Sequence, residues 1–197
     1  MIDGPRVLRY SAFRWPHEDI PIRSNVETTT AAAQTVPAEF IEASCIFLKN
    51  DFLPKLLHCL NSMSDDQIWW RPNEQSNSVG NLVLHLRGNL KQWIAVPLGG
   101  AKFRRDRTAE FATRERVPKA QLIADIQEAV DEVEAVMKGF AANQLLVRYP
   151  IQTYQASALQ AIYHVVEHFS YHLGQILYIY KLQTANDPGF YRHLTQR

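Results

Sequence analysis

The sequence predicts an all-α fold, a four-helix bundle with a long crossover between its second and third helices. Four stretches repeat apolar residues at intervals of three and four, which is the period of a helix with one buried face. A polar, charge-mixed connection, KFRRDRTAEFATRERV, separates the second stretch from the third and is long enough to run along the bundle. No alternating run of strand length competes convincingly, although residues 145–153 can form a short extended piece.

The first two helices are expected over residues 38–62 and 78–96. Pro54 lies inside the first and should kink it or begin a second segment, because proline has no backbone N–H to donate. Ser78 is the expected N-cap of the second helix, since its hydroxyl can accept a hydrogen bond from the first turn. Pro97 and the two glycines that soon follow it should end this helix.

The third helix is expected over residues 118–140, with Pro118 in its first turn, where a missing N–H costs nothing. Its acidic residues fall opposite the apolar stripe, which indicates one solvated face. The fourth helix, over residues 157–182, is long and strongly apolar and should end before Asn186 and Pro188.

Residues 1–36 differ from the rest of the chain and predict an N-terminal extension or arm. The segment PIRSNVETTTAAAQTVP is rich in Thr, Ala and Pro and has no sustained periodicity. Tyr10, Phe13 and Trp15 precede it, so the arm can lie against the body of the protein or against a partner subunit. Residues 37–197 are then one helical domain, a size that buries a sizeable core.

Composition excludes several functional classes. The formal net charge of +1 and the lack of a basic run disfavour nucleic acid as a partner. No apolar run approaches the roughly 18 residues of a membrane span, and the N-terminus has no apolar signal region, so we expect a soluble cytoplasmic protein. Cys45 and Cys59 fall in an apolar helical pattern and are expected to be buried thiols.

The stretch HVVEHFSYHLGQ places histidines at every fourth position, His164, His168 and His172. In a helix this spacing stacks three imidazoles along one stripe. Ala161 and Ile179 share the stripe, so it should face the interior of the bundle. Burying several chargeable rings is costly unless something satisfies them, and a divalent cation does so by binding neutral imidazole nitrogen.

A metal site of this kind needs a further ligand from another helix. His85, in NLVLHLRGNL, is the best candidate because it flanks the apolar stripe of the second helix. Histidine pairs four residues apart also occur often by chance on helices. Core packing and a proton-handling array therefore stand beside metal binding as interpretations of the stripe.

The segments SNSVGNLVLHLRGNL and HVVEHFSYHLGQIL, together with the four-helix plan, resemble the DinB-like superfamily over residues 38–191. The likeness is to a branch described as a domain of unknown function. It implies a four-helix bundle, often dimeric, that holds a divalent metal by three histidines. Carried over position by position, the ligands fall on His85, His168 and His172. Many relatives have Arg or Thr where this chain has Leu173, which removes a polar group near the site.

Two further residues share the arc of the stripe. His164 can contact a ligand residue, face a substrate or pack between helices, and we expect it not to bind the metal. Gln175, one turn beyond His172, can hydrogen-bond a ligand or water, or serve as a packing amide. Glu167 lies to one side of the stripe and is expected to be a solvated or inter-helix carboxylate.

A three-histidine site leaves a coordination position open, which is the pattern of catalytic zinc. Since characterised relatives in the superfamily include thiol-dependent transferases and metal-dependent hydrolases, the resemblance implies a metal-dependent transferase or hydrolase for a small molecule. A low-molecular-weight thiol is the implied co-substrate. Zinc or nickel is the favoured ion, with iron or manganese as alternatives. No Glu follows a ligand as in an H-E-x-x-H helix, so peptide hydrolysis is disfavoured.

The alternative is a non-catalytic, dimeric helical protein that binds a metal or a small ligand. A role in DNA repair is suggested by the name of the superfamily alone, and the even charge balance argues against it. A homodimer is expected from the resemblance and not from any pattern in the sequence.

Overall fold

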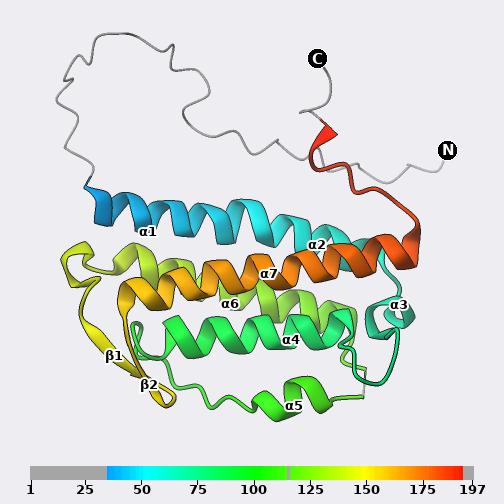
Figure 1. The fold of residues 1–197 in the computed structure, drawn as a ribbon, viewed down its shortest axis with the longest axis horizontal. Coiled ribbons are helices and arrows are strands. Elements are labelled where there is room, and N and C mark those ends of the chain that lie inside the picture. Colours follow the sequence, from blue (N-terminus) through cyan, green and yellow to red (C-terminus); the bar gives the residue numbers. More distant parts are fainter. Residues whose placement is uncertain (1–34, 115, 193–197) are drawn as a thin grey trace, which may run out of the picture.

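The structure is a computed structural model that describes residues 35–114 and 116–192. The predicted extension over residues 1–36 lies almost entirely outside the described residues, so this boundary and the single domain after it stay predictions. The described chain is mostly helical and contains one two-stranded hairpin (Figure 1).

The elements follow one another along the chain with short connections, apart from the segment between α4 and α6. They are α1 (Val36–Ile46), a π-helical stretch (Phe47–Phe52), α2 (Leu53–Ser62), α3 (Asp65–Trp69), α4 (Val79–Leu90), a second π-helical stretch (Lys91–Ala95), α5 (Arg107–Ala112), α6 (Lys119–Gly139), a 3-10 turn (Ala142–Gln144), β1 (Arg148–Ile151), β2 (Tyr154–Ser157) and α7 (Ala158–Thr184).

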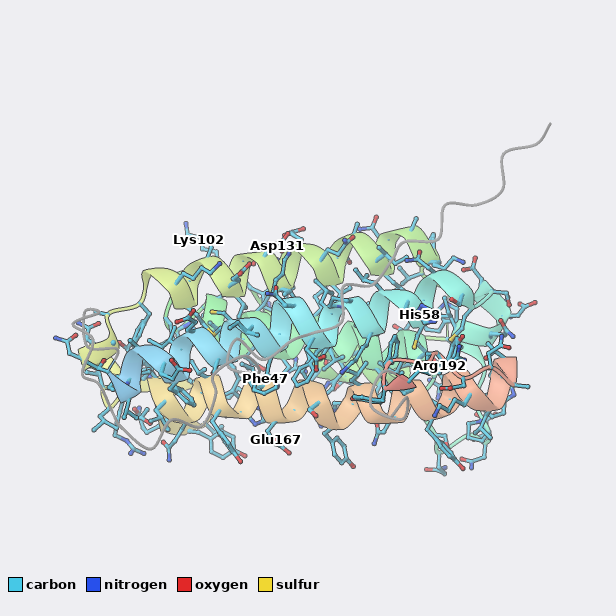
Figure 2. The ribbon with its side chains drawn as sticks, turned by 90° about the horizontal axis from the view of Figure 1, so that it is seen from above. Phe47, His58, Lys102, Asp131, Glu167 and Arg192 are labelled. Atoms are coloured by element: carbon cyan, nitrogen blue, oxygen red, sulfur yellow. The ribbon has the colours of Figure 1, made fainter. Side chains whose placement is uncertain are left out.

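The long helices lie side by side (Figure 1). α1 and α2 form one nearly continuous run that contacts both α6 and α7, and α4 also contacts both α6 and α7. Viewed from above, α6 and α7 lie on opposite sides of the α1–α2 run (Figure 2). Residues of α4 and α7, which are far apart in the sequence, therefore become neighbours.

The core lies where the apolar faces of these helices meet. Along α6, Leu122, Ile126 and Val133 are fully buried. Glu167 projects from the outer side of α7 (Figure 2), and both Glu167 and Asp131 of α6 are exposed. The period of three to four that predicted these helices is thus the period of their burial.

The predicted helical stretches are confirmed as helices. Pro54 lies in the first turn of α2, so it begins a second segment, which was one of the two predicted outcomes. The π-helical stretch directly before α2 fits this position, because Pro54 has no N–H to donate to the preceding turn. Ser78 is the N-cap of α4, as predicted. Pro118 is the N-cap residue of α6 and so lies just outside the helix whose first turn it was expected to occupy.

Two short helices were missed by the sequence analysis, and the hairpin was placed too early in the chain. α3 and α5 are too short to show a period, and each is held by an N-cap, Ser64 and Asp106 respectively. The extended piece expected over residues 145–153 is a hairpin shifted toward the C-terminus, with Ile151 paired to Tyr154 across the turn. Gln152 adopts a positive φ of 56° in that turn, a conformation that sequence rules associate with Gly or Asn.

The two cysteines are free and buried, as predicted. Burial raises the pKa of the Cys45 thiol to about 11 and that of the Cys59 thiol to about 12, so both stay protonated and unreactive near neutral pH. Among the described helices, none combines the length and the apolar character needed to cross a membrane.

The start of α4 is fixed by a capping box. Ser78 Oγ accepts a hydrogen bond from the backbone N–H of Asn81 at 3.2 Å, and the Asn81 side chain accepts one from the Ser78 backbone N–H at 3.3 Å. Asn81 Nδ2 also donates to the backbone carbonyl of Glu110 at 2.8 Å. One buried cap therefore fixes both the start of α4 and the position of α5.

Replacing Ser78 by Ala should lower the free energy of unfolding by about 1 kcal/mol, the usual cost of losing an N-cap. Urea unfolding followed by circular dichroism measures this difference. Ser62→Ala, on an exposed position of α2, is the control and should change stability by less than about 0.5 kcal/mol. Equal stability of the two variants would contradict the role of the cap.

Candidate metal centre

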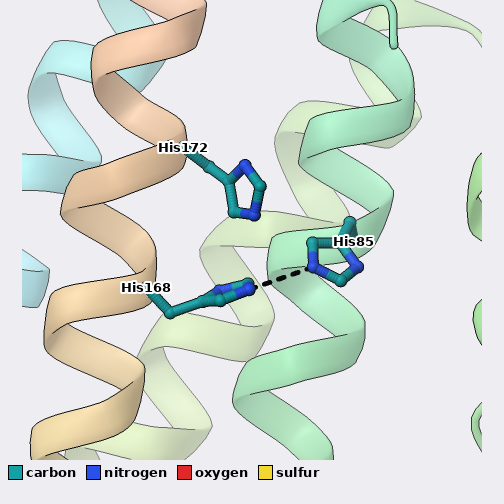
Figure 3. A group of neighbouring side chains, drawn as sticks. All are labelled: His85, His168 and His172. Atoms are coloured by element: carbon teal, nitrogen blue, oxygen red, sulfur yellow. Dashed lines mark hydrogen bonds between the residues drawn. The ribbon is translucent and has the colours of Figure 1, made fainter. Parts of the chain in front are cut away.

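Three of the predicted site residues meet between α4 and α7 (Figure 3). His85 comes from the middle of α4, and His168 and His172 come from successive turns of α7. One ring nitrogen from each histidine lies within 4.8 Å of those of the other two. The Nε2 atoms of His85 and His168 are 3.0 Å apart. The structure thus brings together imidazoles that are widely separated in the sequence.

The cluster has the chemistry and spacing to hold a metal ion. Two nitrogens that each lie about 2.0–2.1 Å from one tetrahedral zinc ion are roughly 3.3 Å apart, close to the separation of the His85 and His168 nitrogens. In addition, Nδ1 of His168 is buried without a hydrogen-bond partner among the described residues. This atom is not the one that faces His85, so the case for an ion rests on the separation of the two Nε2 atoms.

The outer edges of two of the rings are held by hydrogen bonds. His85 Nδ1 lies 2.9 Å from Glu110 Oε2. His172 Nδ1 lies 2.9 Å from Gln175 Oε1. Because carboxylate and amide oxygens accept hydrogen bonds, both contacts favour the tautomer with the proton on Nδ1, which leaves the lone pair on Nε2. This is the state in which imidazole binds a metal.

The histidines of α7 are held neutral by their surroundings. Burial, followed by the nearby His172 and His85, lowers the pKa of His168 from 6.5 to about 3. Burial also lowers the pKa of His172 and of His164. A proton therefore competes poorly for these nitrogens at neutral pH, which favours metal binding.

Glu110 and Arg105 are site residues that the sequence analysis missed. Burial alone would raise the pKa of Glu110, but hydrogen bonds from Arg105 and His85 hold it below its ordinary value, so Glu110 is a carboxylate. Arg105 donates from Nε to Glu110 Oε1 and from Nη2 to Glu110 Oε2, both at 2.7 Å. Their sole signal in the sequence is a mixed-charge connection, which ordinarily indicates a solvated loop.

His164 lies outside the group formed by the other three histidines, and its expected role as a non-ligand stays a prediction. Its Nε2 atom is 3.1 Å from Asn89 Nδ2, and its ring packs on Trp93 with centroids 4.1 Å apart. The ring of His168 is its neighbour at 5.2 Å. His164 therefore contacts His168 of the cluster and packs between α7 and the second π-helical stretch.

Leu173, the position at which the resemblance implied a polar residue, belongs to the hydrophobic core and is 4% exposed. Its side chain therefore contributes to packing of α7 against the neighbouring helices. Glu167 is exposed on the outer side of α7, which agrees with a solvated carboxylate.

A groove of about 550 Å³ opens beside His172. It lies between the loop that precedes α4 and the outer face of α7 and is lined by Pro72, Gln75, Ser76, Asn77, Leu82, Tyr171, Gly174, Gln175, Tyr178 and Ile179. Within the part of the chain that the structure describes, no charged side chain lines this groove. Gln175, which takes a hydrogen bond from His172, is the residue that links the groove to the histidine cluster.

The metal-free protein should lose stability as the pH falls below about 6.5, because unfolded histidines take up protons there. Folded His168 does so only near 3. Between these values the unfolded chain binds more protons, so the free energy of unfolding rises with pH. Urea unfolding in the presence of a chelator, at roughly pH 5 and roughly pH 7.5, measures the difference. His168→Gln should reduce it, and an unchanged difference would contradict the buried neutral state.

Comparison with known protein families identifies one family that matches this chain. The family described as "Protein of unknown function (DUF1572)" matches residues 54–194, which include the three clustered histidines. A comparison with curated proteins finds no match. Because the family match covers most of the chain, the protein is a member of the DUF1572 family, whose function is unknown.

Proposed function

We propose that this protein is a divalent-metal-binding, DinB-like helical bundle that acts on a small molecule through His85, His168 and His172. The observation that carries the proposal is the convergence of three ring nitrogens, one from each residue, within 4.8 Å of one another. Packing histidines rarely point their nitrogens at a shared point, because buried polar atoms normally find separate partners.

The arrangement of the helices supports the DinB-like part of the proposal. The α1–α2 run and α4 both contact α6 and α7, as in a four-helix bundle, and the segment between α4 and α6 serves as the long crossover. The three histidines also fall at the positions that the superfamily resemblance implies for ligands.

The ligand set favours a site with chemistry over a purely structural one. Three protein ligands leave one position of a tetrahedral ion for another group, and a bound ion would act there as a Lewis acid toward water or a low-molecular-weight thiol. Imidazole ligands suit zinc or nickel, with iron or manganese as alternatives. The three rings would hold the ion in place, and the surrounding apolar core would exclude bulk water.

The groove beside His172 is the proposed place for the small molecule. The described residues that line it offer neutral hydrogen-bonding groups and tyrosine rings, and none of them is charged. Gln175 can accept from His172 and still donate from its amide nitrogen to a ligand. An uncharged, polar substrate therefore fits the groove better than a phosphorylated or strongly acidic one.

A non-catalytic metal- or ligand-binding protein is the second candidate. Glu110 is bound on the outer side of His85 by Arg105, so it is not free to serve as a general base. Among the described residues, the histidine cluster includes no carboxylate, which suits either transfer of a metal-activated thiol or simple binding. The homodimer and the cytoplasmic location remain predictions.

The metal content of the untagged protein tests the site. We expect about one divalent ion per chain and at least a roughly tenfold loss of affinity in His85→Gln, His168→Gln and His172→Gln, since each removes one ligand. His58→Gln is the matched control because His58 contacts Tyr180 and Phe190 away from the cluster. Equal metal content in all variants would overturn the ligand set.

Cobalt substitution separates the two candidate functions. Binding of a low-molecular-weight thiol in the open position should add a sulfur-to-cobalt absorption band and shift the visible spectrum of the cobalt protein, because the ligand set changes. This result supports the transferase. A stoichiometric cobalt site whose spectrum responds to neither thiols nor small esters supports the non-catalytic binding protein instead.

A further inference from the structure

We propose that Glu110, held by Arg105, is a positioning residue that fixes the tautomer and the orientation of His85, so that its Nε2 atom faces the histidine cluster. This inference rests on the proposed metal-binding function. It adds a role for α5 and for the crossover that contains it. It gives the segment between α4 and α6 a defined role at the site.

The Glu110 carboxylate is bound on both oxygens. Oε1 accepts from Arg105 Nε, and Oε2 accepts from Arg105 Nη2 and from His85 Nδ1, at distances of 2.7, 2.7 and 2.9 Å respectively. Arg105 Nη2 also lies 2.9 Å from His85 Nδ1, but both are donors that share the same carboxylate oxygen. The fork of Arg105 therefore fixes the carboxylate, and the carboxylate fixes the imidazole.

All three side chains are buried. The exposed side-chain fractions are 5% for His85, 10% for Glu110 and 4% for Arg105. A buried ion pair is a weak source of net stability, because desolvation offsets most of its attraction. Its presence here is better explained by the orientation it gives to His85. The carboxylate holds Nδ1, and Nδ1 is on the opposite side of the ring from the histidine cluster.

The helix makes room for this pair. A Cβ atom at Gly88, one turn after His85, would lie 2.0 Å from Glu110 Oε1 and 2.8 Å from Arg105 Nε. Glycine at position 88 is therefore required by the ion pair and not by the backbone of α4. This close approach is independent of the hydrogen bonds and points to the same arrangement.

Further contacts hold the two charged residues in register with α4. The backbone carbonyl of Glu110 accepts from Asn81 Nδ2 at 2.8 Å, and Arg105 Nη1 donates to Gln92 Oε1 at 2.8 Å. The ring of Phe111 packs on His85 with centroids 4.5 Å apart. The crossover therefore contacts α4 before His85 and at His85, and contacts the π-helical stretch that follows α4.

Carboxylates that accept from a metal-bound histidine fix its tautomer and raise its basicity. Loss of Glu110 should therefore weaken metal binding without removing any ligand, by roughly 10–100-fold. The tautomer of His85 should also change in the metal-free protein, because Glu110 is the one hydrogen-bond acceptor recorded at His85 Nδ1 among the described residues.

The test uses the full chain with two variants and one control. Arg105→Met with Glu110→Leu removes both charges together, so no lone charge stays buried. Glu110→Gln retains an acceptor for His85 Nδ1 and serves as the conservative rescue. Asp125→Asn is the control, because Asp125 faces Arg87 of α4 in an ion pair away from His85.

Two quantities are measured: the zinc Kd by competition with a chromophoric chelator, and the His85 tautomer of the metal-free protein by nitrogen-15 correlation NMR. The expected result is the Nδ1–H tautomer in the wild type, in Glu110→Gln and in the control. The double variant should show a shift toward Nε2–H and a Kd that is weaker by roughly 10–100-fold.

Unchanged tautomer and Kd in the double variant would overturn the inference. Equal losses in the double variant and the Asp125→Asn control would also overturn it, since they would indicate general destabilisation. If the wild type binds no zinc, the proposed function fails, whereas the tautomer measurement still decides whether Glu110 sets the state of His85.

Discussion

The packing of α4 against α7 is the constraint on which the candidate site depends. A spacing of four residues on α7 brings His168 and His172 together, but a third imidazole must arrive from a helix far away in the sequence. The height of His85 along α4 is set by the buried Ser78 cap and by Gly80, where a Cβ would lie 2.8 Å from the Trp69 indole. A shift of one turn in this packing would separate the ring nitrogens.

The polar groups of the interior are divided into two zones around His85. On the side of α7, several neutral imidazoles face one another in a space where protonation is costly, as the pKa of His168 near 3 indicates. On the side of α5, a carboxylate and a guanidinium neutralise each other. His85 lies between the zones. Its Nε2 atom faces the imidazoles, and its Nδ1 atom contacts the carboxylate of Glu110. This division lets one residue be both a candidate ligand and a well-oriented one.

The groove and the crossover give the site its asymmetry. Gln175 joins His172 to a neutral groove on the outer face of α7, whereas Glu110 joins His85 to the crossover on the opposite side. His168, between them, has no partner for Nδ1 among the described residues. A small molecule would therefore approach from the side of His172. The crossover would contact His85 on the opposite side of the cluster through Glu110.

The sequence by itself determined the helical stretches, the capped start of α4 and the three histidines, because these features are local or periodic. Burial repeats with the helical period, and a cap or an i, i+4 pair involves neighbouring residues. Only the tertiary structure decided that Arg105 and Glu110 belong to the interior, that Gly88 makes room for them, and that Leu173 packs in the core. Those roles depend on which segment lies across from another, and a mixed-charge loop has the same composition whether it is solvated or folded against a histidine.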